Sequence, residues 1–227
     1  MTREELLALR RPARFAAWAL GTGTFGRALA AVALAMVFSI LGAYRLGSTV
    51  NVEDFAFGPS RNVTIDALIS AIGIERTAVL VYMMQRSFAA LVVASALTPI
   101  FFWLLGSSAM HAAARIRGLR GRAYLPMLVL FAYAALVYQA PTSVAALAFG
   151  PLGEGAGSQL ANAVSLAMLA WFAFVVYRGI EQHYGVSGER AMLIFVIGGL
   201  VFYLLPFVLI IGTLVGLVVT AALLQYF

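Results

Sequence analysis

Long apolar runs that end at charged residues dominate the pattern of the chain. The hydrocarbon core of a bilayer is about 30 Å thick and takes around 20 helical residues. Five charge-free stretches approach or exceed that length, so the pattern predicts an all-α protein, a polytopic transmembrane helical bundle of five spans. The stretches are Ala28–Tyr44, Ser87–Ala114, Ala123–Gly153, Gly155–Tyr177 and Ala191–Phe227.

Prolines interrupt two of these stretches. A proline ring removes one helical hydrogen bond and clashes with the preceding turn, so we expect the third helix to start near Tyr124 and to weaken around Ala140, beside Pro141. The last stretch has 37 residues, about 55 Å of helix, which exceeds the length of one span. We favour one span kinked near Pro206, because Tyr203–Leu209 has no polar turn residue. A hairpin of two spans, which would make six in all, is the alternative.

Two segments outside the spans carry helical signals. In the N-terminal segment, residues 1–27, Thr2 and Glu5 form a capping box for a short helix over Thr2–Leu9 on the membrane surface. In the long loop over residues 46–85, apolar residues repeat at helical spacing. We interpret this loop as an external interfacial helix that caps the bundle of residues 28–227; a substrate lid is the alternative. The repeating residues are Ile65, Leu68, Ile69 and Ile72.

Composition supports a membrane environment. Hydrophobic residues make up 63% of the chain and charged residues 11%, and the mean hydropathy is +0.97. A soluble domain has about a quarter of its residues charged, so water cannot be the only solvent of this protein. The sequence has no cysteine, which excludes disulfides, zinc–thiolate sites, iron–sulfur clusters and thiol catalysis.

The charge distribution predicts an orientation. All 15 basic residues are arginines, and they separate apolar runs instead of forming the clustered basic face of a nucleic-acid-binding domain. Loops rich in arginine stay in the cytoplasm. The N-terminal segment, the second connection (His111–Ala123) and the fourth connection hold 11 arginines, against four on the opposite side. We therefore predict a cytoplasmic N-terminus and an external C-terminus. Because the absence of lysine fits a GC-rich bacterial genome, the predicted location is a bacterial cytoplasmic (inner) membrane.

A glycine-rich string precedes the first span, at Gly21–Gly26, and has the form Gly-x-Gly-x-x-Gly. A kinase loop of this form requires a lysine for the phosphates, and the chain has none. A dinucleotide-binding loop requires a preceding strand and a soluble βαβ unit. We interpret the string as a flexible link before the span.

Polar side chains at the end of the second span suggest two kinds of chemistry. Ser107, Ser108 and His111 are of the types that an intramembrane serine protease uses, but no acid accompanies them, and a polar cap is the simpler interpretation. His111 and His183, with Glu181 nearby, are a weak metal set, because metal sites normally have three or four ligands. We predict no catalytic, cofactor-binding or metal-binding residues and no enzymatic activity.

Charged residues are absent from the middle of every predicted span. Charges inside membranes mark ion or proton pathways, so their absence argues against a pump, an antiporter or a proton-coupled carrier. Polar residues near the outer ends of the third and fourth spans either line a shallow cavity or bond to neighbouring helices. These residues are Gln139, Thr142, Ser143, Gln159, Asn162 and Ser165.

Two motifs are candidate contact sites. Gly212 and Gly216 form a Gly-x-x-x-Gly pair, which allows close helix packing within the chain or in a homo-oligomer. The second connection holds four arginines and no acid. It is either a contact surface, for anionic lipid headgroups or for an acidic membrane-protein partner, or a loop that only sets the topology. The four are Arg115, Arg117, Arg120 and Arg122.

The second and fourth connections carry a pattern that resembles the Yip membrane family (Ypt-interacting proteins), over roughly Arg11 to Leu214. In Trp103–Met127 the order is His111, Arg115, Gly118, Gly121, Tyr124 and Pro126, and Tyr177–Ala191 contains His183, Tyr184, Gly185, Val186 and Ser187. The family's adjacent glycine pair followed by phenylalanine is here Gly118 and Gly121 with Tyr124. Gly185 can end the fourth span in a left-handed C-cap.

The resemblance implies five spans with a cytoplasmic N-terminus. The family's Rab-type GTPase binding, linked to an Asp-Leu-Tyr-Gly-Pro motif before the first span, is not carried over, because Asp54–Pro59 matches that motif loosely and lies after the span. We predict a non-enzymatic multi-pass membrane protein that organises or accompanies other membrane components. The alternative is a transport component, either a small-solute permease or the membrane subunit of a multi-subunit exporter.

Overall fold

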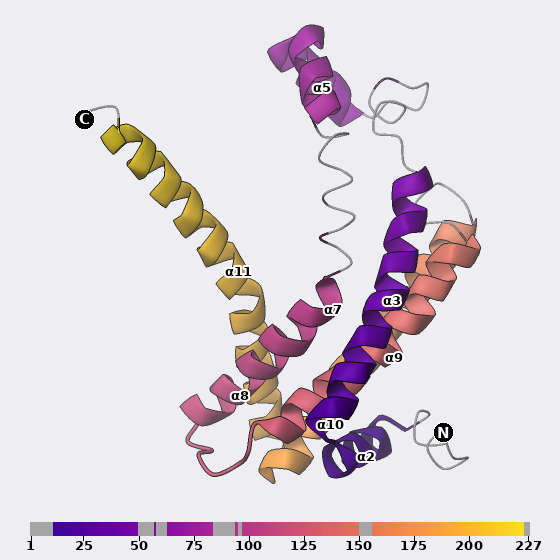
Figure 1. Ribbon diagram of the computed structural model, residues 1–227, viewed down its shortest axis with the longest axis vertical. Helices are drawn as coiled ribbons and strands as arrows, with labels where there is room; N and C mark the ends of the chain where they lie inside the picture. The colour runs from indigo at the N-terminus through magenta and orange to yellow at the C-terminus, as the bar shows by residue number, and fades with distance from the viewer. Residues whose placement is uncertain are drawn as a thin grey trace. The chain divides into compact units, whose positions relative to one another are not determined.

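The computed structural model describes residues 11–49, 57, 63–83, 94, 97–149 and 156–224. Their secondary structure is helical (Figure 1), which confirms the all-α class for this part of the chain. A π-helical turn, η1 (Phe102–Gly106), joins α7 to α8, and residues 74–83 are also helical. The α-helices are α2 (Pro12–Thr22), α3 (Phe25–Thr49), α5 (Val63–Ile72), α7 (Thr98–Phe101), α8 (Ser107–Ile116), α9 (Leu125–Phe149), α10 (Ala156–Tyr184) and α11 (Gly188–Leu224).

Four described helices are long and apolar enough to cross a membrane: Phe25–Tyr44, Leu125–Phe149, Gln159–Tyr184 and Gly188–Pro206. They coincide with the first, third, fourth and fifth predicted spans, as expected of an integral membrane protein. The remaining predicted span, Ser87–Ala114, is described continuously only from residue 97, where α7, η1 and α8 follow one another. The second predicted span therefore stays a prediction.

Both prolines that were expected to disturb helices lie inside them. α11 runs without a break through Pro206, so the hairpin alternative, and with it the count of six spans, is wrong. α9 likewise starts at Leu125, as expected, but continues through Pro141 to Phe149, so the expected weakening around Ala140 does not end it. Next to Pro141, the Thr142 hydroxyl donates to backbone carbonyls of the preceding turn, and such side-chain bonds let apolar helices tolerate proline.

The predicted helix in the long loop is confirmed as α5. Gly73 follows it with a φ of 84°, a left-handed conformation that glycine adopts without strain, and the helical residues 74–83 continue after this break. The helix predicted over Thr2–Leu9 lies outside the described residues. Instead, the structure has a helix that the sequence analysis did not predict, α2, with Pro12 at its first position, where proline is favoured.

The chain divides into two compact units. Unit 1 contains Met1–Ala31, Ile100–Ala135 and Trp171–Phe227, and unit 2 contains Val32–Pro99 and Leu136–Ala170. Each unit has buried helix contacts of its own.

The core of unit 1 lies between α8, the first part of α9, the last part of α10 and the first part of α11. α11 packs along α8, and a β-carbon placed on Gly198 of α11 would lie 3.1 Å from the Cα atom of Met110 on α8. Such a short distance means that the two backbones approach closely. The fully buried large side chains of the core are Met127, Leu130, Phe131, Ile180 and Ile194.

In unit 2, α3 meets the second half of α9 through small residues. A β-carbon on Gly42 would lie 3.2 Å from the Ser143 hydroxyl, and Ser143 is buried. The Gln139 side-chain amide donates to that hydroxyl at 3.0 Å. The polar residues predicted near the outer end of the third span are thus bonded within α9, which supports a packing role for them.

Candidate functional site

The candidate site is the end of unit 1 at which α8 turns into α9. α8 ends in a Schellman motif, in which the backbone N–H of Leu119 donates to the carbonyl of Ala114 and that of Gly118 to Arg115, both at 3.0 Å. Gly118 has a φ of 86°, which only glycine adopts readily. We call the segment Arg115–Arg122 the basic elbow.

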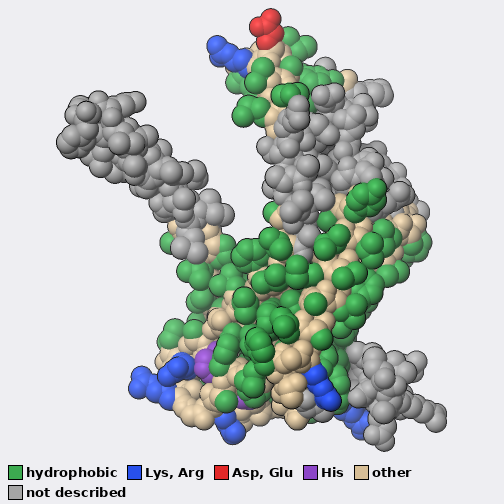
Figure 2. Space-filling view, viewed as in Figure 1, with side chains coloured by type: hydrophobic (Ala, Val, Ile, Leu, Met, Phe, Trp, Pro, Cys, Tyr) green, Lys and Arg blue, Asp and Glu red, His purple; other side chains and the backbone are tan. Residues whose placement is uncertain are grey.

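The basic elbow exposes all four of the arginines that the sequence singled out. Each side chain is exposed, and none of them pairs with a carboxylate of the described chain. Figure 2 shows arginine side chains gathered at the end of unit 1 that also holds the histidines. Within the described residues, no carboxylate therefore neutralises these four positive charges. The four residues are Arg115, Arg117, Arg120 and Arg122.

Tyr124 ties the elbow to α8. Its hydroxyl lies 2.8 Å from the Ser107 hydroxyl and 2.9 Å from that of Ser108. Ser107 also donates to the carbonyl of Trp103 inside η1. Neither serine is hydrogen-bonded to His111 in the described structure. The serine–histidine pair that a protease would require is not formed, and the serines serve to hold helices together.

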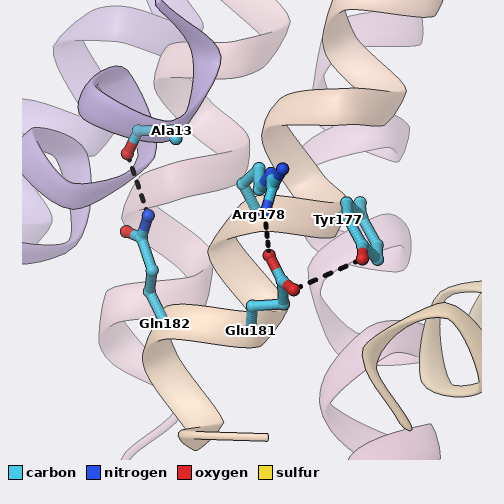
Figure 3. A network of polar contacts seen from close by, with 5 residues as sticks. All are labelled: Ala13, Tyr177, Arg178, Glu181 and Gln182. Carbon is cyan, nitrogen blue, oxygen red and sulfur yellow. Dashed lines mark hydrogen bonds and ion pairs between the residues drawn. The ribbon is translucent and has the colours of Figure 1, made fainter. Parts of the chain in front are cut away.

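The two histidines connect the same end to α10. His111 Nδ1 lies 2.7 Å from the Tyr184 hydroxyl, and His183 Nε2 lies 2.9 Å from the carbonyl oxygen of Ala123. Glu181, the third member of the weak metal set, is bonded to Arg178 at 2.7 Å and accepts from the Tyr177 hydroxyl at 3.3 Å (Figure 3). No cluster of three or more metal-ligating side chains occurs within the part of the chain that the structure describes.

α10 ends beside the elbow in the way its sequence predicts. Gly185 has a φ of 64°, and the backbone N–H of Val186 donates to the carbonyl of Glu181 at 3.2 Å. The expected left-handed C-cap at Gly185 is thus confirmed. A β-carbon on Gly185 would lie 3.8 Å from the Arg122 guanidinium, which places this arginine next to the end of α10.

α2 docks on the same end of unit 1, a contact that the sequence analysis missed. The Gln182 amide donates to the carbonyl of Ala13 at 2.9 Å (Figure 3). The Phe15 ring lies 5.0 Å from that of Trp171, edge to face, and α2 buries Phe15 together with two alanines. The signal in the sequence was the apolar spacing of Phe15, Ala16 and Ala19, which places one face of a short helix against the bundle.

Neighbouring residues of α10 thus contact two basic segments. Gln182 touches Ala13, which lies between Arg11 and Arg14, and His183 touches Ala123, which follows Arg122. Segments more than 100 positions apart in the sequence are thereby brought to one place. We call this surface the basic end. Its exposed arginines are Arg11, Arg14, Arg115, Arg117, Arg120 and Arg122.

The other predicted contact motif, Gly212 and Gly216, lies in the last part of α11. The structure describes the helical backbone there but not the surroundings of the residues. Gly198 of α11, by contrast, has an observed close approach to the backbone of α8. Comparisons with protein-family models, with characterised proteins and with solved structures find no match to this chain. The resemblance to the Yip family rests on the sequence pattern alone.

The basic end should lose stability at low pH. His111 opens the second connection, and burial, followed by the charge of Arg115, lowers its pKa below 6.5. Tyr124 and Tyr184 face its ring, and His183 is close enough to interact with it electrostatically. The folded state therefore binds the proton less readily than the unfolded state, and stability falls as the pH drops below 6.5.

We expect the thermal unfolding temperature of the purified protein to fall between pH 7.5 and pH 5.5, both being about one unit from the ordinary histidine value. His111→Gln keeps a hydrogen-bonding side chain but cannot titrate, so its unfolding temperature should fall less. An equal fall in both proteins would contradict this role of His111.

Proposed function

We propose that this chain is a non-enzymatic multi-pass membrane protein that organises or accompanies other membrane components, with its basic end at the cytoplasmic face. The observation that carries the proposal is the basic end itself. Exposed arginines with no carboxylate partner among the described residues stand on a backbone that is fixed by the Schellman motif of α8, by the C-cap of α10 and by tyrosine hydrogen bonds. Such a surface is suited to contact and not to chemistry.

The use of the polar side chains supports this proposal. Ser107, Ser108 and His111 are bonded to tyrosine hydroxyls, so the groups that most resemble catalytic ones link helices. In α9, Gln139 and Thr142 bond within their own helix. These arrangements favour a packed bundle over a polar pathway through it.

The orientation can be tested with reporters that are active only in the cytoplasm. We expect activity for fusions after Arg14, within Arg117–Arg122 and after Gly185, because arginine-rich loops are retained on that side. Fusions after Gly58, after Gly155 and at the C-terminus should be inactive. Activity after Gly58 or Gly155 would show that the orientation is the opposite of the predicted one. A cytoplasmic C-terminus together with a cytoplasmic N-terminus would mean an even number of spans.

The organising role can be tested by purifying the protein in a mild detergent and identifying bound components by mass spectrometry. Replacing the four elbow arginines by glutamine should remove components that bind the basic end, while the reporter fusions show that the orientation is kept. If wild-type protein and variant retain the same components, the elbow is only a connector and the proposed role is wrong.

A further inference from the structure

We propose that the basic end binds anionic phospholipid headgroups, and that α2 and the basic elbow form this surface together. The inference deepens the proposed function by naming the partner of the basic end. It requires only that the chain lies in a bilayer, because a membrane with two identical leaflets offers the same headgroups to either orientation.

The charge balance of the basic end favours an anionic partner. Six exposed arginines come from α2 with its N-cap residue Arg11 and from the elbow. Two carboxylates, Glu181 and Glu189, belong to the described part of unit 1. Glu181 is already bonded to Arg178, which leaves Glu189 at the start of α11. An arginine side chain can bind a phosphate through two parallel N–H groups, and clustered arginines near a membrane attract its anionic lipids.

Exposed apolar side chains beside the arginines indicate that this partner is a lipid and not an acidic protein. Ile116, inside the elbow, is 73% exposed, and Leu125, just after it, is 42% exposed. At the start of α3, Phe25 and Leu29 are 53% and 51% exposed on either side of Arg27. Apolar residues that alternate with basic ones are typical of the headgroup–acyl boundary, where arginine stems lie along hydrocarbon and their guanidinium groups reach the phosphates.

Aromatic residues mark the same boundary. Tyr124 and Tyr184 bond at the basic end, and Trp18 of α2 lies 4.9 Å from the ring of Tyr133, with neither of the two rings fully exposed. Tryptophan and tyrosine concentrate at the interface between water and hydrocarbon, because they combine an apolar ring with a polar group. Their position agrees with a headgroup-level location of the arginines.

The two basic segments are held by the same turn of α10, so their arginines keep a defined separation. Gln182 fixes α2 through Ala13, and His183 fixes the end of the elbow through Ala123. A headgroup-binding surface fixed in this way does not have to order its parts on binding. This is the reason for including α2 with the elbow in one surface.

The test uses the full chain reconstituted into nanodiscs that contain phosphatidylglycerol and phosphatidylcholine. The quantity measured is the ratio of the two lipids retained by the protein after extraction with a mild detergent, determined by mass spectrometry. Variants replace the four elbow arginines by glutamine, Arg11 and Arg14 by glutamine, or all six. Arg76→Gln, at an exposed position of unit 2, is the control for loss of a positive charge elsewhere.

Wild type should enrich phosphatidylglycerol, and the enrichment should fall as salt rises, because the interaction is electrostatic. One arginine near an anionic surface is worth roughly fivefold in binding, so we expect a loss of at least about tenfold for the elbow variant, a smaller loss for the α2 variant and the largest for the six-residue variant. Arg76→Gln should behave as wild type. Replacing the four elbow arginines by lysine should keep most of the enrichment.

The thermal unfolding temperature of each glutamine variant shows whether it is folded. The proposal is overturned if the folded glutamine variants enrich phosphatidylglycerol as wild type does. It is also overturned if the lysine variant loses as much as the glutamine variant, because charge would then not be the cause. Loss of a co-purifying acidic protein with unchanged lipid enrichment would assign the surface to a protein partner. That result would leave the organising role standing while removing the lipid one, so the two failures are distinguishable.

Discussion

Gly198→Ala is expected to destabilise the bundle by about 1–3 kcal/mol, the usual cost of forcing extra atoms into a packed core. The new β-carbon would lie 2.4 Å from Met110 Sδ and 3.1 Å from Met110 Cα. The sulfur can move, because a methionine side chain is flexible. The Cα atom belongs to the backbone of α8, so α11 would have to move away from α8 along a contact that holds unit 1 together.

The neighbouring glycine provides a matched control. Gly199 also lies within α11, but a β-carbon there meets nothing within 4 Å. Alanine is favoured over glycine in a helix by up to about 1 kcal/mol, so Gly199→Ala should leave the unfolding temperature unchanged or raise it. The measurement is thermal or denaturant-induced unfolding in one detergent. Equal behaviour of the two variants would show that α8 and α11 do not approach closely at Gly198.

The close approach at Gly198 illustrates what sequence reasoning could not supply. The Gly-x-x-x-Gly spacing directed attention to Gly212 and Gly216, because that spacing favours packing in apolar helices. Gly198 has an adjacent glycine, Gly199, and no such partner four residues away. Which face of α11 meets α8 depends on how the helices are arranged in space, and helical spacing does not contain that information.

The four spans found among the described residues were predictable, since length and hydropathy are local properties of the sequence. The fate of Pro206 was predictable for the same reason, because the residues around it offer no turn. α2 was missed because a helix of 11 residues is marginal by itself and is stabilised by tertiary packing. Its packing partners, Trp171 and Gln182, lie far away in the sequence.

In the candidate site, too, the local features were predictable from the sequence and the contacts between distant residues were not. The elbow arginines lie within eight consecutive positions, so their clustering was visible in the sequence. The hydrogen bond between His111 and Tyr184 joins residues 73 positions apart, and that between Gln182 and Ala13 joins residues 169 positions apart. Such pairs require knowledge of the fold, and they decide that the serines and histidines serve the structure of the basic end.

Gly23→Ala is the second substitution for which we expect a large effect, again about 1–3 kcal/mol of destabilisation from overpacking. Gly23 joins α2 to α3 with φ −85° and ψ 116°, a conformation that any residue adopts, so backbone strain is not the reason for glycine here. A β-carbon would lie 2.2 Å from Val129 Cγ1 and 2.7 Å from Val129 Cβ. Val129 is fully buried, and a β-branched side chain in a helix is restricted to one main rotamer.

The glycine-rich string offers its own controls. Gly21 and Gly26 share the string with Gly23, and a β-carbon at either meets nothing within 4 Å. If the string were only a flexible link, as its sequence suggested, alanine would have similar effects at all three positions. The structure instead predicts that Gly23→Ala alone lowers the unfolding temperature, because only this glycine permits the link to lie against α9.

A double-mutant cycle attributes the effect to the contact with Val129. Val129→Ala removes both γ-methyl groups and should itself cost stability, as the loss of buried methyl groups does. In that background Gly23→Ala should cost less than it does in the wild type, with a coupling of about 0.5–3 kcal/mol, as found for residues in direct contact. Additive effects of the two substitutions would mean that the Gly23 link does not pack on α9. The docking of α2, and with it the joint lipid surface, would then lose one of its structural supports.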